Sequence, residues 1–260
     1  MLGDPAPVSA DGAPRWRPTL RRSVRLLDDF RYEQPDPDRF YRALAADSVG
    51  QLTSYLGDAG LRGLSLLDVG GGPGYFRDAF AAAGATYWAL DADVGELSGL
   101  GAIAAGTVVG SGMQLPFRDD CLDVCYSSNV LEHVPDPWRM AEEMVRVTRP
   151  GGLVFLSYTV WWGPWGGHET APWHYLGGMR ARRRYRRTHG REPKNRYGES
   201  LFAVTVAAGV GWARHRAGRG DVELVHLLPR YHPWWARWVM HVPVLRELVT
   251  WNLVVVLRKR

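Results

Sequence analysis

Short apolar segments alternate with helix-forming segments through the middle of this chain, and this alternation restricts the fold more than any other feature. The apolar segments span residues 64–69, 86–91, 103–109, 122–127 and 153–158. Each is bounded by glycine or polar residues and is typical of a strand buried on both faces. Strands that alternate with helices form parallel sheets with right-handed crossover connections. The chain is therefore predicted to be an α/β protein with a doubly wound sheet.

Segments on either side complete a seven-stranded sheet. Helices are expected at residues 18–30, 37–56, 75–83, 136–147 and 199–216, and two closing strands at 222–227 and 253–257. The glycine-, tryptophan- and arginine-rich residues 160–198 interrupt the alternation and are interpreted as an insertion after strand five. We predict a mobile segment at 1–16 and one domain at 17–260. Its parts would be an N-terminal helical cap at 17–60, a ligand-binding core at 61–159, the insertion at 160–198, and a closing helix and strands at 199–260.

A glycine-rich loop joins the first strand to the following helix. Residues 66–74 read Leu-Leu-Asp-Val-Gly-Gly-Gly-Pro-Gly, with glycines at 70, 72 and 74. Glycines let the backbone turn sharply and approach a ligand closely, and the helix N-terminus offers free N–H groups. The G-x-G-x-x-G pattern of dinucleotide sites fails because residue 75 is tyrosine. The loop therefore predicts a nucleotide-like ligand, bound through a D-x-G-x-G-x-G pattern that begins at Asp68.

A carboxylate stands at the end of the second strand. Asp91 lies 21 residues after Gly70 and would reach the same edge of the sheet. A carboxylate at that position can accept both hydroxyls of a ribose. The alternative is that Asp91 caps the next helix, but Asp93 is the better candidate for that cap. Asp91 is therefore predicted to bind a ribose.

Four segments in this order resemble the class I S-adenosylmethionine-dependent methyltransferase family, of the type that acts on small molecules and lipids. They are the glycine loop, residues 110–117 after the third strand, residues 129–133 after the fourth, and the Arg-Pro-Gly-Gly turn at 149–152. The resemblance covers roughly residues 60–160. It implies a Rossmann-like fold whose last strand runs antiparallel between strands five and six. It also implies S-adenosyl-L-methionine as cofactor and S-adenosyl-L-homocysteine as product.

The resemblance implies a role for each of ten residues. The amino acid end of the cofactor would lie against Asp68, Gly70, Gly72 and Gly74. The ribose would lie at Asp91, the adenine ring beside Ala92, Ser111, Gly112 and Met113, and the methionine portion beside the backbone of Asn129. The family usually has an acidic residue, which receives the adenine amino group, where this chain has Ser111. Serine can accept that hydrogen bond but carries no charge.

Three histidines are candidates for a general base that removes a proton from the methyl acceptor. They are His133, just after the fourth strand, and His168 and His174 in the insertion. Each could instead pack or hydrogen-bond within its loop, and Glu132 either orients its loop or lies near the acceptor. His168, Glu169 and His174 also offer three nitrogen or oxygen ligands, but not at the H-E-x-x-H spacing of a helical zinc site. We therefore predict no metal site.

The second part of the chain is basic and aromatic. Residues 161–260 hold 18 of the 32 Lys and Arg residues, 6 of the 27 Asp and Glu residues and 9 of the 12 tryptophans. The insertion follows the carboxyl end of a strand, where ligands bind in such sheets, and is expected to line the acceptor site. The arginines of residues 180–187 and Trp234, Trp235 and Trp238 suit contact with anionic lipid headgroups and a membrane interface. Alternatively, the arginines form a solvated helix face and the tryptophans pack over the closing strands.

These features predict O-methylation of a hydrophobic or amphiphilic small molecule, such as a lipid, a glycolipid or a polyketide-like metabolite. An RNA methyltransferase and a non-catalytic cofactor-binding adaptor are the alternatives. No DNA target is expected, because residues 127–130 lack the Pro-Pro-aromatic run of nucleic-acid amino-methyltransferases. Cys121 and Cys125 are interpreted as buried core residues, and no signal peptide is evident. We therefore expect a cytoplasmic protein with peripheral contact at the inner membrane face.

Overall fold

Seven strands form one mixed sheet in the computed structural model, which describes residues 16–30, 32, 36–98 and 104–260. The strands are β1 (Ser65–Val69), β2 (Thr86–Asp91), β3 (Thr107–Val109), β4 (Leu122–Ser128), β5 (Thr148–Thr159), β6 (Val222–Pro229) and β7 (Asn252–Lys259). Their order is β3-β2-β1-β4-β5-β7-β6, and β7 runs antiparallel to both of its neighbours. The predicted Rossmann-like sheet and its inserted antiparallel strand are confirmed. The mobile segment predicted at 1–16 lies outside the described residues except for Trp16.

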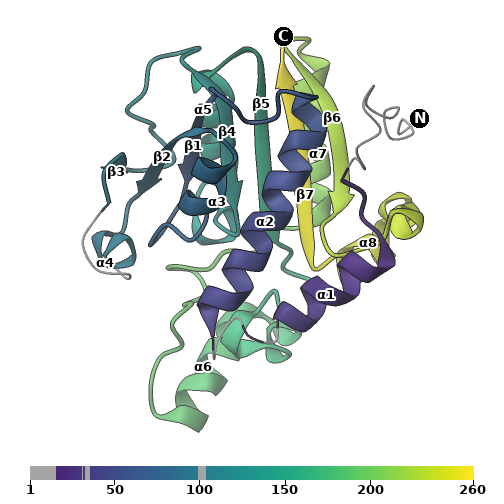
Figure 1. Cartoon of the computed structure of the whole chain (residues 1–260). Coiled ribbons are helices and arrows are strands. Elements are labelled where there is room, and N and C mark those ends of the chain that lie inside the picture. The colour runs from purple at the N-terminus through teal and green to yellow at the C-terminus, as the bar shows by residue number, and fades with distance from the viewer. Residues whose placement is uncertain (1–15, 31, 33–35, 99–103) are drawn as a thin grey trace.

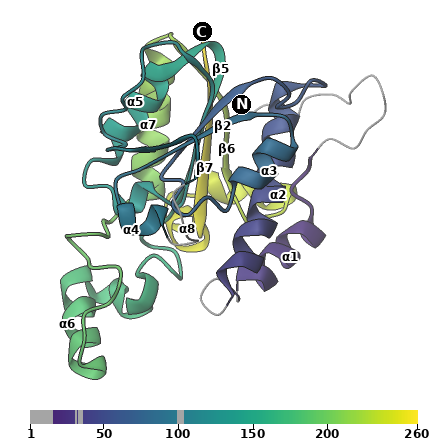
Figure 2. The same cartoon turned by 60° about the vertical axis from the view of Figure 1, so that its left-hand side comes forward.

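Helices cover both faces of this sheet (Figure 1, Figure 2). They are α1 (Leu20–Phe30), α2 (Pro37–Leu56), α3 (Arg77–Ala82), α4 (Val94–Leu97), α5 (Pro137–Val147), α6 (Gly178–His189), α7 (Val206–Gly218) and α8 (Pro243–Val249), with short 3₁₀ helices η1 (Leu131–His133), η2 (His168–Thr170), η3 (Trp173–Leu176) and η4 (Trp234–His241). Phe40 of α2 and Phe80 of α3 belong to the core on one face, which α1 also joins. Met140 of α5 and Val210 of α7 belong to the core on the other.

The insertion lies beyond the carboxyl end of β5. Figure 1 shows its helix α6 at the bottom of the molecule, below the edge at which β1, β4 and β5 end. Because β7 runs the opposite way, its first residue lies at that same edge, paired with Thr159 at the end of β5. The edge that carries the glycine loop therefore faces the insertion, as the sequence predicts.

The structure corrects the extent of the third predicted strand. Only Thr107–Val109 pair with β2, whereas the expected strand spanned residues 103–109. Gly106 has a φ of +77°, which is not an extended conformation. In addition, the guanidinium of Arg77 donates to the Ala105 carbonyl over 2.6 Å. The Ala89 N–H of β2 still donates to the Gly106 carbonyl over 3.0 Å, but the positive φ of Gly106 means that the regular strand begins only at Thr107.

The predicted helix at 199–216 and the predicted burial of Cys121 are also corrected. The helix begins at Val206, because the hydroxyl of Thr205 accepts the Ala208 N–H and caps it. Residues 199–205 lead to it without helical structure. Cys125 is buried inside β4, but Cys121 precedes the first residue of that strand and is exposed.

A buried ion pair fixes α1 to α2. The guanidinium of Arg22 donates from Nε and Nη2 to the Asp47 carboxylate over 2.6 Å each, and from Nη1 to the Arg230 carbonyl over 2.7 Å. Burial by itself would raise the pKa of Asp47, but the hydrogen bonds and charge of Arg22 lower it overall. The helical cap is therefore tied by one charged group to the chain segment that follows β6.

Replacing Asp47 with Asn should lower the free energy of unfolding by about 3 kcal/mol, because Arg22 would keep a buried charge without an anionic partner. Urea denaturation followed by circular dichroism measures this loss. Asp120→Asn is the matched control, since Asp120 pairs with Lys259 at the surface over 2.6 Å and is half exposed. That variant should lose less than about 1 kcal/mol. Equal losses in the two variants would contradict this account.

Candidate functional site

The glycine loop turns away from β1 at a point of very close packing. Gly70 has a φ of +79°, and a Cβ atom added there would lie 2.4 Å from Cγ2 of Val130. Only glycine fits such a position. Further along the loop, Gly72 has a φ of +48°, and no described atom would lie within 4 Å of an added Cβ. The loop is thus packed against the segment after β4 at Gly70 and open toward a ligand at Gly72.

Asp91 lies at the end of β2 with its carboxylate beside this loop. Its Oδ2 accepts the Gly72 N–H and its Oδ1 accepts the Asp93 N–H, each over 3.0 Å. Asp93 in turn caps α4 by accepting the N–H of Gly95 over 2.7 Å. The helix cap predicted for Asp93 is therefore confirmed. Asp91 is partly exposed and keeps lone pairs for a ribose hydroxyl.

Asp68 is buried at the base of the loop. Its Oδ2 accepts a hydrogen bond from the Tyr87 hydroxyl over 2.8 Å. Burial raises the pKa of Asp68, the Tyr87 hydrogen bond opposes that rise and the negative charge of Asp91 adds to it, so that the pKa is about 7. A cationic amino group beside this carboxyl would favour its ionised form. The position suits the amino acid end of a cofactor.

The residues predicted on the adenine side follow β2 and β3. Ala92 is exposed, and Ser111, Gly112 and Met113 are partly buried. The Ser111 hydroxyl accepts the Met113 N–H over 3.2 Å, which fixes the turn. A Cβ atom on Gly112 would lie 3.0 Å from the Met140 sulfur, so the turn packs closely against α5.

Asn129 closes the site after β4. It has a φ of +58°, its N–H donates to the Ser157 carbonyl over 2.8 Å, and its Oδ1 accepts from Asn252 over 2.7 Å. All ten predicted cofactor residues therefore lie at the carboxyl ends of β1, β2, β3 and β4. Open space at Gly72, a partly exposed carboxylate at Asp91 and a buried one at Asp68 fit a ligand with a ribose and an amino acid group.

The structure separates the three candidate histidines. The rings of His133 and His168 are 5.1 Å apart between centroids, although they come from η1 and η2. His174 is fully buried against Trp161, and its Nε2 lies 3.2 Å from the Gly163 carbonyl. Its contacts are those of a residue that packs the insertion. His133 and His168 are the pair that can face an acceptor.

His168 has a buried imidazole beside that of His133. Burial, together with the neighbouring His133 and His174, lowers the pKa of its imidazole to about 3. Its Nε2 is buried without a hydrogen-bond partner in the described part of the chain. An imidazole with so low a pKa stays neutral and is a weak proton acceptor.

Glu132 is a site residue to which the sequence assigned no definite role. It is buried, its Oε1 accepts the Thr159 N–H over 2.8 Å, and its Oε2 has no partner among the described residues. Glu132, His133 and His168 each offer a ligand atom within 4.8 Å of the others. Among the described residues the alternative set of His168, Glu169 and His174 does not gather in this way, and Asn195 donates to both carboxylate oxygens of Glu169. The Leu-Glu-His motif pointed to Glu132 as a site residue, but the sequence could not show that His168 of the insertion lies beside it.

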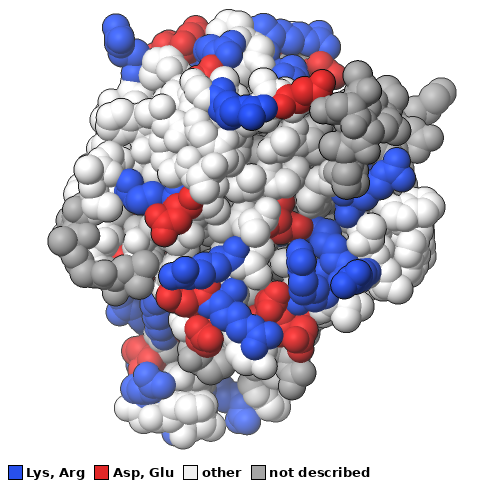
Figure 3. All heavy atoms as spheres, viewed as in Figure 1, with Lys and Arg blue, Asp and Glu red and all other residues white. Residues whose placement is uncertain are grey.

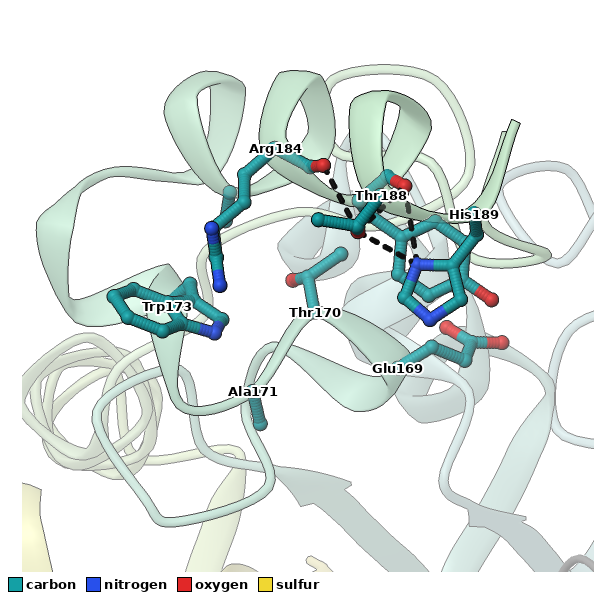
Figure 4. Close-up of a pocket in the computed structure, with 9 residues that line it drawn as sticks. Glu169, Thr170, Ala171, Trp173, Arg184, Thr188 and His189 are labelled. Carbon is teal, nitrogen blue, oxygen red and sulfur yellow. Dashed lines mark hydrogen bonds between the residues drawn. The ribbon is translucent and has the colours of Figure 1, made fainter. Parts of the chain in front are cut away.

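The insertion contains a cavity of about 350 Å³ (Figure 4). It lies between η2, η3 and α6, and its lining includes Glu169, Thr170, Trp173, Arg184 and His189. The Arg184 guanidinium stacks over the Trp173 ring at 3.9 Å. None of the glycine loop residues lines this cavity, so it is separate from the cofactor residues. Glu169 directly follows His168, so the cavity begins next to the histidine pair.

Replacing Asp91 with Asn should weaken the binding of S-adenosyl-L-homocysteine by about tenfold, because the charged acceptor for the ribose hydroxyls is lost. Isothermal titration calorimetry measures this affinity. The matched control is Asp93→Asn, which keeps the α4 cap and should bind the ligand as the unaltered protein does. Unchanged affinity in the Asp91 variant would show that the ribose lies elsewhere.

The raised pKa of Asp68 predicts a pH-dependent contribution to stability. The folded protein holds this proton up to a pH of about 7, whereas the unfolded chain releases it near pH ~3.9. Stability associated with Asp68 is therefore lost as the pH rises through this range. Asp68→Asn removes the titration and still accepts from Tyr87. The free energy of unfolding of the variant, relative to that of the parent, should therefore be higher at about pH 8 than at about pH 5. Urea denaturation at both pH values tests this, and a constant difference would refute it.

Comparisons with known proteins agree with this geometry. Residues 67–156 match the family model described as a methyltransferase domain. Proteins named as uncharacterized methyltransferases from Mycobacterium marinum and Mycobacterium tuberculosis are 55% and 56% identical to this chain. The alignments cover 94% and 93% of this chain and 96% of each relative. A solved S-adenosylmethionine-dependent methyltransferase from Mesorhizobium loti has a similar fold, with a TM-score of 0.52 at 19% identity over 76% of this chain and 92% of that one. The chain therefore belongs to the class I S-adenosylmethionine-dependent methyltransferases.

Proposed function

We propose that this enzyme methylates a hydroxyl group of a hydrophobic or amphiphilic small molecule, such as a lipid, a glycolipid or a polyketide-like metabolite, at a membrane surface. The observation that carries this proposal is an exposed surface of large apolar side chains. We call it the tryptophan surface, and it comprises Leu20, Val24, Trp234, Trp235, Trp238, Val242, Val244 and Leu248. Such contiguous apolar surfaces are rare on proteins that contact only water.

The tryptophan surface joins two distant parts of the chain. The N–H of Trp234 donates to the Pro18 carbonyl over 2.6 Å, which places η4 beside the start of α1. Trp234, Trp235 and Trp238 are 61%, 55% and 55% exposed, so these rings do not pack over the closing strands. Tryptophan is the residue that favours the boundary between headgroups and acyl chains.

Positive charge borders the tryptophan surface. Arg17, Arg21 and Arg25 are exposed on the segment that carries Leu20 and Val24. Figure 3 shows blue side chains gathered over α1, next to an uncharged area of the surface. Arginines around exposed aromatic rings suit a membrane that contains anionic lipids.

The site offers polar groups on its acceptor side. S-adenosyl-L-methionine supplies a methyl group on a sulfonium centre, so the protein has to align the acceptor oxygen and help it lose its proton. The Nδ1 of His133 lies 2.7 Å from the Ser200 carbonyl and must donate to it. The other ring nitrogen, Nε2, therefore has a lone pair that can accept a proton. His168 and Glu132 stand beside it. These groups favour a hydroxyl acceptor.

The arginines of α6 are less suited to binding an RNA backbone. Arg182 pairs with Glu192 and Glu199 over 2.8 Å each, and Arg186 pairs with Glu192 over 3.3 Å. Arg184 is stacked on Trp173. Half of the six arginines between residues 180 and 187 are thus engaged within the protein. The labelling experiment below includes methylation of RNA as one of its possible results.

No helix in the described ranges is long and apolar enough to cross a bilayer.

Incubation with a total cell extract and cofactor carrying a tritiated methyl group tests the proposal. Label in the organic phase, reduced in the Asp91→Asn variant when the cofactor is subsaturating, supports a lipophilic acceptor. Alkaline stability of the product distinguishes an ether from an ester. Label in the RNA fraction, with binding that weakens steeply as salt rises, would replace the proposal with RNA methylation. Cofactor binding without any labelled product would indicate a non-catalytic protein.

A Trp235→Ser, Trp238→Ser double variant should bind vesicles containing phosphatidylglycerol at least about tenfold more weakly, because two interfacial rings are lost. Vesicle sedimentation measures this binding. Trp88→Ser is the matched control, since Trp88 is also exposed but lies on β2, toward the opposite edge of the sheet. Equal binding by the double variant and the control would remove the membrane from the proposal.

A further inference from the structure

We propose that Glu132, His133 and His168 form a binding site for one divalent transition-metal ion, such as Zn²⁺, on the acceptor side of the active site. The three residues come from η1 and η2, which the insertion brings together. The part played by the ion in methyl transfer rests on the proposed O-methylation, whereas its binding does not.

Two of the three side chains, Glu132 and His133, are each held by one atom and have another atom free. Glu132 uses Oε1 to accept the Thr159 N–H, and its buried Oε2 has no partner in the described residues. His133 donates from Nδ1 to the Ser200 carbonyl, which leaves the lone pair of Nε2. Metal-binding histidines typically donate their other N–H to a carbonyl in this way, which fixes the tautomer and the ring orientation.

His168 completes the set from the insertion. Its Nε2 is buried and has no partner among the described residues. It also has a φ of +47°, an uncommon conformation for a residue other than glycine, and this turn of the chain brings its ring to 5.1 Å from that of His133. Two buried polar atoms without partners, on side chains that face a third ligand, would be costly unless something bound them.

The donor set selects the kind of ion. Two imidazole nitrogens and one carboxylate suit Zn²⁺ and similar transition metals, whereas Mg²⁺ and Ca²⁺ prefer oxygen ligands. The ligand atoms lie within 4.8 Å of one another. Around a tetrahedral Zn²⁺ they would be about 3.4 Å apart, so small side-chain rotations would close the site. Three protein ligands leave one position open, as in catalytic zinc sites.

An acceptor hydroxyl could occupy the open position. A bound Zn²⁺ lowers the pKa of an oxygen ligand strongly, as it does for water. The hydroxyl would release its proton to solvent water, and its oxygen would keep the electron pair that forms the new bond to the methyl group.

Calorimetric titration of the untagged, chelator-treated full chain with Zn²⁺ tests the site, and Co²⁺ absorption reports the ligand geometry. One equivalent should bind, and Mg²⁺ should not displace it. Glu132→Gln, which keeps the acceptor for Thr159, and His168→Asn should each weaken Zn²⁺ binding at least about tenfold. His215→Asn, at an exposed histidine on α7, is the control and should bind as the parent does. Circular dichroism verifies the fold of each variant.

Absence of a stoichiometric Zn²⁺ or Co²⁺ site would overturn the proposal, as would unchanged binding in a folded Glu132→Gln or His168→Asn variant. These readouts need no acceptor, so they are independent of the proposed function. Zn²⁺ bound at this site without any methylated lipid would reject only O-methylation. Methylated lipid without bound metal would instead return His133 to the role of a general base.

Discussion

The close approach of Gly70 to Val130 determines the geometry of the whole carboxyl edge. β1 and β4 are parallel neighbours, so the segments that follow them must turn away from the same edge within a few ångströms of each other. A side chain at Gly70 would overlap Val130, and its positive φ directs the loop over the end of the sheet. The glycine loop therefore goes to one side of this contact and the Leu-Glu-His turn to the other.

This contact divides the site into two halves. Asp68 and Asp91 lie on the cofactor side with the glycine loop, and both are tied to it or to β2 by hydrogen bonds. Glu132 and His133 follow shortly after Val130, and their ligand atoms lie within 4.8 Å of that of His168 from the insertion. Asn129 directly precedes Val130, and Asn252 of β7 donates to its side-chain oxygen. The antiparallel direction of β7 is what brings Asn252 to this edge.

The sequence was sufficient for the features that depend on local chemistry. Apolar segments, glycine positions and the cap at Asp93 predicted the sheet, the loop and the start of α4, and the helix expected at 136–147 is α5. Prediction failed at β3, where the positive φ of Gly106 interrupts an apolar segment and the regular strand begins only at Thr107.

The acceptor side was predictable only in part. His133 and His168 are 35 positions apart in the sequence, and nothing in either segment shows that their rings meet. The burial of Glu132 and of His174 likewise depends on how the insertion packs against the carboxyl edge of the sheet. The tryptophans were recognisable as an unusual group, but their exposure depends on the position of η4 beside α1.

A crystal structure with S-adenosyl-L-homocysteine bound is the most direct test of this division of the carboxyl edge. The account predicts that the Asp91 carboxylate accepts both ribose hydroxyls and that the ligand sulfur faces the side of Glu132, His133 and His168. A ligand seated in the cavity between Trp173 and Arg184, or one whose sulfur points away from the histidine pair, would contradict it.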